Sequence, residues 1–169
     1  LDAAQRLIFI SGDLMSRLIP EIDKIAAYAK GERVTIKDVD AVASHIPEAV
    51  IFEMTELISQ KKYNSALSVL AELLSDKNNE PIAMTAMLGL QMRKLYAARL
   101  AIEQELGSKY VMEVCAIKYD YIASKLIAAA RGFTLPQLIR AVELCGEADY
   151  RMKSSGQDAR ELLKEAVAR

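Results

Sequence analysis

The chemistry open to this chain is limited first by its histidines, because the 169 residues contain only one, His45. A single imidazole excludes the Glu-x-x-His pairs of di-iron helical bundles and the His-Glu-x-x-His zinc helix. Any nucleophilic triad would have to use His45 as well, and it stands two residues before Pro47 in an expected connection. We therefore predict a capping or surface role for His45, with no catalytic residues and no metal site.

The other reactive side chains form no constellation either. Cys115 and Cys145 are thirty positions apart and make no Cys-x-x-Cys pair, so free, buried thiols in a reducing compartment are expected. The acidic pair Glu53 and Glu56 has no neighbours that would shift a pKa, which indicates a solvated helix face. No Gly-x-x-x-x-Gly-Lys-[Ser/Thr] loop is present. The sequence thus predicts a non-catalytic chain without cofactors.

The composition indicates which elements the chain is built from. It is 52% hydrophobic and 27% charged, with 7 Gly and 4 Pro, which excludes a disordered chain, collagen and a β-sandwich punctuated by Gly and Pro. No segment alternates like a strand, so we predict an all-α fold. The net charge is −1, and basic residues are interspersed with acids, which argues against tight DNA binding by this chain alone. Without a signal peptide or an 18-residue apolar run, secretion and membrane spanning are not expected.

Residues 1–45 are predicted to form a small bundle of three short helices. The first ends near Ile10, Ser11 is expected to N-cap the second helix over 14–30, and Gly31 is expected to end it in the left-handed conformation. Thr35 and Asp38 are expected to cap the third. The buried face of the second helix should carry the apolar residues at three- and four-residue steps, namely Leu14, Leu18, Ile22, Ile25, Ala26 and Ala29.

Residues 46–169 are predicted to form a second, larger helical domain, because the residue before Pro47 is driven out of the helical region. Asp120, Thr134 with Gln137, and Asp158 are expected N-caps, and Gly132 an expected helix stop. The expected helices cover residues 50–60, 64–75, 81–106, 111–116, 121–131, 135–153 and 159–169. The long helix is expected to bury the stripe Met84, Met87, Leu88, Gln91, Leu95, Ala98 and Ile102.

Several runs of residues, taken in order, carry a resemblance to a known family. They are Ser-Gly-Asp-Leu at 11–14, Ala-Tyr-Ala at 27–29, Ile-Phe-Glu-Met at 51–54, Gln-Met-Arg-Lys-Leu at 91–95, Ala-Arg-Gly-Phe-Thr at 130–134 and Glu-Ala-Asp at 147–149. With this order and spacing, the chain resembles the delta subunit of the bacterial DNA polymerase III clamp loader, a relative of the AAA+ ATPases. The run at 130–134 and the residues after it are the most specific part.

The resemblance implies a fragment that lacks the family's N-terminal domain, which grips the sliding clamp. Residues 1–45 would be an AAA+ lid-like domain, and residues 46–169 the collar that holds the loader subunits together during DNA replication. The implied partners are the ATPase subunits and delta-prime, through the collar. The sliding clamp would be contacted only by the missing domain and DNA at most indirectly, with no membrane. The chain would be a cytoplasmic, non-catalytic part of a DNA-directed DNA polymerase holoenzyme.

The resemblance also points to individual residues. Met15 stands where AAA+ lids often offer an arginine to ATP phosphates, and a methionine cannot donate to phosphate, so no nucleotide is expected. Arg131, Arg140 and Arg151 are candidates for pairing with acids on a neighbouring subunit, although a solvated face is the alternative for each. Two other identities stay open: the lid and collar of an ATP-binding loader subunit of the gamma or delta-prime type, and an unrelated helical interaction scaffold.

Overall fold

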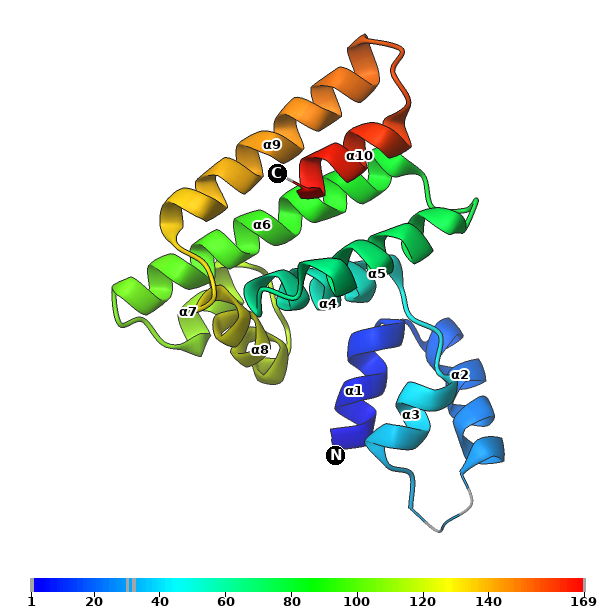
Figure 1. Ribbon diagram of the computed structural model, residues 1–169. Coiled ribbons are helices and arrows are strands. Elements are labelled where there is room, and N and C mark those ends of the chain that lie inside the picture. Colours follow the sequence, from blue (N-terminus) through cyan, green and yellow to red (C-terminus); the bar gives the residue numbers. More distant parts are fainter. Residues whose placement is uncertain (1, 30, 32, 169) are drawn as a thin grey trace. The chain divides into compact units, whose positions relative to one another are not determined.

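The computed structural model describes residues 2–29, 31 and 33–168, and within them it contains ten α-helices and no strand (Figure 1). This confirms the all-α class. The chain divides into two compact units, residues 1–50 and 51–169. The expected domain boundary lay between residues 45 and 46. The helix that begins at Pro47 contributes its first turn to the first unit and the rest to the second.

Three helices pack against one another in the first unit: α1 (Asp2–Ser11), α2 (Met15–Tyr28) and α3 (Ile36–Val42). Thr35 and Asp38 form the predicted capping box, because the Thr35 N–H donates to the Asp38 carboxylate at 2.8 Å and the Asp38 N–H donates to the Thr35 hydroxyl at 3.4 Å. The core is small. Its buried apolar side chains are Leu7, Phe9, Ile10, Leu18, Ile25, Val39 and Ala49.

The predicted ends of α2 are wrong. Ser11 is the last residue of α1, and its hydroxyl donates to the Ser44 carbonyl at 2.8 Å instead of capping α2. The chain turns at Gly12, whose φ is 84°, so Ser11 stays on the α1 side of that turn. Gly31 does not adopt a positive φ, since α2 already ends at Ala29 in an extended conformation. Lys30, the predicted last residue, lies outside the described residues.

The predicted buried face of α2 is correct only in part. Leu18 and Ile25 are buried, but Leu14, Ile22 and Ala26 are exposed. The helix carries apolar residues on two faces, and α1 and α3 cover one of them. The third buried position of that face is Glu21, which the apolar pattern did not predict.

Glu21 is buried because its carboxylate is fully engaged. It accepts hydrogen bonds from the Lys24 ammonium at 2.6 Å and from the Ser44 N–H at 2.9 Å, so it joins α2 to the segment after α3. The Lys24 ammonium also donates to the Ser44 hydroxyl at 3.1 Å. Burial alone would raise the pKa of the Glu21 carboxyl, but the hydrogen bonds from Lys24 and Ser44 outweigh it, and the pKa is lowered.

Glu21→Gln is therefore expected to lower the free energy of unfolding of the first unit by about 1 kcal/mol at neutral pH. Because the folded-state pKa is depressed, the stabilisation is present above the unfolded pKa and is lost as the pH falls through the folded one. Urea unfolding of both proteins, from neutral pH down into the range where carboxylates protonate, should show the difference shrinking. Asp23→Asn, an exposed charge change on the same helix, should cost little at any pH. A difference that persists at acid pH would contradict a role for the charge.

The second unit is organised around its longest helix, α6, which packs against α7, α8, α9 and α10. Figure 1 shows α6 and α9 running side by side, with α10 alongside them. Besides the rest of α4 (Pro47–Ser59), the helices of this unit are α5 (Tyr63–Ser75), α6 (Pro81–Glu103), α7 (Ser108–Val114), α8 (Asp120–Ala130), α9 (Leu135–Ser154) and α10 (Ala159–Ala168).

Local signals in the second unit are confirmed where they depend on neighbouring residues. Pro81 occupies the first turn of α6. Thr134 and Gln137 form the capping box of α9. The Asp158 carboxylate accepts from the Arg160 N–H at 2.8 Å at the start of α10. Most residues of the predicted α6 stripe are buried. Met87 and Ile102 are the exceptions, since both are half-exposed, and Ala101 is buried although it was not predicted to be.

Two predicted signals work differently from the expectation. Asp120 does not cap α8, whose N-cap is Tyr119. As the first helical residue, Asp120 instead accepts a hydrogen bond from the Ser108 hydroxyl at 2.7 Å, which joins α7 to α8. Gly132 follows the end of α8 but has no positive φ. A Cβ at Gly132 would lie 2.4 Å from the Ser59 carbonyl oxygen, so a close approach of two backbone segments requires glycine there.

Candidate functional site

The groups that could carry chemistry are dispersed. His45 is exposed in the connection between α3 and α4. Cys115 and Cys145 are free, buried thiols, as predicted, and burial raises both pKa values, that of Cys145 to about 11. Thiols with raised pKa values are poor nucleophiles at neutral pH. Within the described parts of the chain, no cluster of three His, Cys, Asp or Glu could hold a metal ion, and no helix has the length and apolarity to span a membrane.

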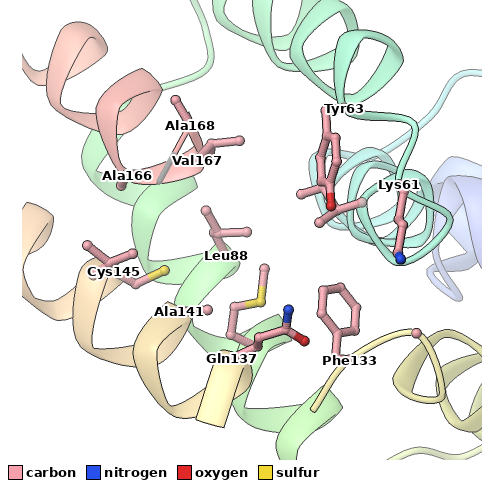
Figure 2. Close-up of a pocket in the computed structure, with 14 residues that line it drawn as sticks. Lys61, Tyr63, Leu88, Phe133, Gln137, Ala141, Cys145, Ala166, Val167 and Ala168 are labelled. Carbon is pink, nitrogen blue, oxygen red and sulfur yellow. The ribbon is translucent and has the colours of Figure 1, made fainter. Parts of the chain in front are cut away.

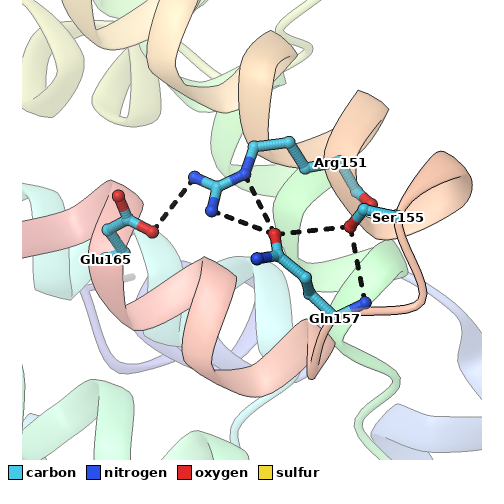
Figure 3. A network of polar contacts seen from close by, with 4 residues as sticks. All are labelled: Arg151, Ser155, Gln157 and Glu165. Carbon is cyan, nitrogen blue, oxygen red and sulfur yellow. Dashed lines mark hydrogen bonds and ion pairs between the residues drawn. The ribbon is translucent and has the colours of Figure 1, made fainter.

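Arg151 is the most constrained of the three candidate interface arginines. Its guanidinium pairs with the Glu165 carboxylate at 3.1 Å and donates twice to the Gln157 side-chain carbonyl, at 3.2 and 3.0 Å (Figure 3). The Ser155 hydroxyl lies 3.3 Å from the same carbonyl. Arg151 thus joins the end of α9, the following turn and α10 of its own chain. An acid on a neighbouring subunit would have to compete with Glu165 for this guanidinium.

Arg140 is also engaged within its own helix. Its guanidinium donates to the Glu147 carboxylate at 3.0 Å and to that of Glu143 at 3.3 Å, and these hydrogen bonds, the one to Glu147 first, raise the pKa of Arg140. Arg140 and Arg151 are eleven residues apart, three helical turns, and therefore lie on one face of α9. This face carries alternating charges that neutralise one another locally.

Arg131 differs from the other two arginines. It is exposed at the C-terminal end of α8, where a cation interacts favourably with the helix dipole. Its guanidinium makes no hydrogen bond or ion pair within the described residues. Of the three arginines, Arg131 is the one that can meet an external acid without breaking a contact in its own chain.

Met15 begins α2 and is 64% exposed. It is the first of three exposed apolar side chains that follow one another at one-turn intervals along α2, namely Met15, Ile19 and Ile22. Of these, Ile22 had been predicted to lie on the buried face. The signal was present, because the apolar residues of α2 span more than the one face that a small bundle can cover. Exposed apolar clusters of this kind are typical of surfaces that pack against another protein surface.

Comparison with known proteins gives one consistent family. The family described as "DNA polymerase III delta subunit, C-terminal domain" matches residues 48–169. DNA polymerase III subunit delta of Bacillus subtilis (strain 168) is 26% identical over 164 residues, which cover 96% of this chain and 47% of that protein. The probable DNA polymerase III subunit delta of Aquifex aeolicus (strain VF5) is 26% identical over 166 residues, covering 97% and 47%.

A solved structure agrees with these sequence matches. The Bacillus subtilis DNA clamp loader delta protein superposes with a TM-score of 0.78 at 26% identity, covering 99% of this chain and 50% of that one. The chain thus spans about half the length of the curated relatives it matches. The matches name the delta subunit and not an ATP-binding loader subunit, which was the alternative. Because the family match extends over most of its length, the chain belongs to the family formed by the C-terminal domain of the DNA polymerase III delta subunit.

Proposed function

We propose that this chain is the lid and collar part of a clamp-loader delta subunit, with residues 1–45 as the lid-like domain and 46–169 as the collar. The observation that carries the proposal is the family match over residues 48–169, which coincides with the second expected domain almost from its first residue. Both relatives match over nearly the whole chain, the first unit included. The collar would hold the loader's subunits together while the sliding clamp is loaded on DNA in the bacterial cytoplasm.

The arrangement of the second unit supports a holding role. Its longest helix is packed on several sides by other helices, and Arg151 ties the last two helices together. A packed unit of this kind resists deformation, so it can keep attached domains in register while they move. We assign no catalysis to this chain. Its partners would be the ATPase subunits and delta-prime, and DNA would be contacted at most indirectly.

The chain is expected to enter a complex when it is mixed with the ATPase and delta-prime subunits of its own organism. Native mass spectrometry should show a single copy of the chain in that complex. Assembly of the chain as it stands would mean that the lid-like domain and the collar together suffice. If the chain stayed alone while a full-length delta subunit of that organism assembled, the lid-like domain and the collar would not be enough to hold the loader's subunits together, and the proposed function of this chain would be wrong.

The Arg131→Glu variant tests, by the same native mass spectrometry, whether the surface around Arg131 contacts another subunit. Reversing this unpartnered charge should weaken assembly about tenfold, the effect of about 1.4 kcal/mol at an interface. The melting temperature should fall only slightly, because no hydrogen bond or ion pair within the described residues is lost and only the favourable interaction of the cation with the α8 dipole is reversed. Arg33→Glu, an equal charge reversal at an exposed position of the first unit, is the control and should assemble normally. Equal assembly of both variants would exclude Arg131 from the interface.

A further inference from the structure

The second unit contains a cavity of about 420 Å³ that no step of the proposed assembly uses. It lies among the end of α4, the start of α5, α6, the N-terminal half of α9 and the end of α10 (Figure 2). Its volume is within the range of about 300–1,000 Å³ that is usual for small-molecule sites. The residues that form it are distant in the sequence, so only the packed unit creates it.

The walls of the cavity are mainly apolar. Leu88 and Met92 of α6 form part of them together with Ala141 and Cys145 of α9. Among the described residues that line the cavity there is no aspartate or glutamate. An apolar cavity without carboxylates favours an apolar body and does not repel an anion.

Three polar groups face this apolar space. Lys61 from the connection after α4 and Tyr63 from the start of α5 both line the cavity, and Figure 2 shows the two side chains at its rim. Neither group has a hydrogen-bond or ion-pair partner within the described residues. Gln137 supplies the third. Its carbonyl oxygen accepts from the Thr134 N–H at 2.9 Å in the capping box, so its amide nitrogen is turned away from that box and toward the cavity.

The backbone holds Lys61 in place at the rim. The Lys61 N–H donates to the Ile58 carbonyl at 2.9 Å and the Lys62 N–H donates to the Leu57 carbonyl at 2.9 Å, which closes α4 with Lys61 in the left-handed conformation at φ 60°. A lysine at this position is less favourable than a glycine. The ammonium is thus presented at the rim by an ordered turn.

We propose that this cavity binds a small amphipathic carboxylate, with the aliphatic chain against α6 and α9 and the carboxylate at Lys61. Tyr63 and Gln137 would donate further hydrogen bonds to the carboxylate oxygens. The inference is independent of the proposed assembly function, because the cavity is formed entirely by residues of the second unit. The proposed binding is non-covalent.

Cys145 provides a reporter inside the cavity. Cys145 as a whole residue is 7% exposed and lines the wall, whereas Cys115 is 8% exposed and does not line it. The two thiols therefore make a pair with similar exposure and different surroundings. A molecule that occupies the cavity should shield Cys145 from alkylation and leave Cys115 unaffected.

The experiment measures alkylation of both thiols by iodoacetamide at mildly alkaline pH, by mass spectrometry, with decanoate as the probe and decanol as its neutral counterpart. At a decanoate concentration about ten times its Kd, Cys145 should react about tenfold more slowly and Cys115 at an unchanged rate. Lys61→Gln should raise the Kd for decanoate about fivefold and leave the Kd for decanol unchanged. Lys62→Gln is the matched control, because Lys62 does not line the cavity.

Any of the following outcomes would overturn the proposal. Absence of Cys145 protection, or equal protection of both thiols, would show that decanoate does not occupy the cavity specifically. Equal decanoate affinity of Lys61→Gln and Lys62→Gln would show that the rim does not recognise the carboxylate. A last outcome combines two measurements. If decanoate failed to protect Cys145 in the parent chain, and Ala141→Trp, which fills the cavity, weakened assembly with the loader subunits, the cavity would receive a side chain of a neighbouring subunit instead.

Discussion

Replacing Gly132 by alanine is expected to lower the free energy of unfolding by about 3 kcal/mol. The added Cβ would lie 2.4 Å from the carbonyl oxygen and 2.8 Å from the Cβ of Ser59. The atoms it would meet are backbone atoms of Ser59 and the Cβ of that residue. Because a rotamer change moves none of these atoms, it cannot relieve the contact. The segment after α8 and the end of α4 would have to move apart.

Gly146→Ala is the matched control, and it is expected to change stability in the opposite direction. Gly146 lies within α9, and a Cβ there would meet nothing within 4 Å. Alanine in a helix interior is more favourable than glycine by about 0.5–1 kcal/mol. Urea unfolding of the three proteins, followed by circular dichroism, measures both effects. Similar stability of Gly132→Ala and the parent would show that the two segments separate readily.

Replacing Ile10 by alanine is expected to unfold the first unit selectively. Ile10 is 0% exposed among a short set of apolar residues, and an isoleucine deleted to alanine in a core costs about 2–5 kcal/mol. A small unit buries little apolar surface and has correspondingly little stability to lose. The second unit has its own, larger core and should stay folded.

Amide hydrogen exchange distinguishes this local loss from global destabilisation. Amides of α1, α2 and α3 should lose protection in Ile10→Ala, whereas those of α6 and α9 should exchange as slowly as in the parent. Ile19→Ala is the control of the same residue type, because Ile19 is 52% exposed on α2. If α6 and α9 also lost protection, the two units would unfold together and would not be independent folding units.

Features of this protein that depend on neighbouring residues follow from the sequence by itself. The all-α class comes from composition and periodicity, and the capping boxes at Thr35 and Thr134 come from side chains three residues apart. Pro81 at the start of α6 and Asp158 at the start of α10 are of the same kind. The interactions are completed within one turn of helix, so the local chain decides them.

Tertiary structure decided the features whose partners lie far along the chain. Ser11 and Asp120 have the residue types of N-caps, but they bond Ser44 and Ser108, which the fold brings close to them. The periodicity of α2 shows that it is amphipathic, but only α1 and α3 determine which of its apolar faces is buried.

The candidate sites follow the same division. The sequence supplied the three arginines as candidates, and the packing of α10 against α9 gave Arg151 a partner fourteen residues away and left Arg131 free of partners within the described residues. The cavity depends on tertiary structure even more, because Lys61, Gln137 and Cys145 line one space only when α4, α6 and α9 are packed. Periodicity and caps act over a few residues, whereas a cavity or an interface depends on the packing of whole helices.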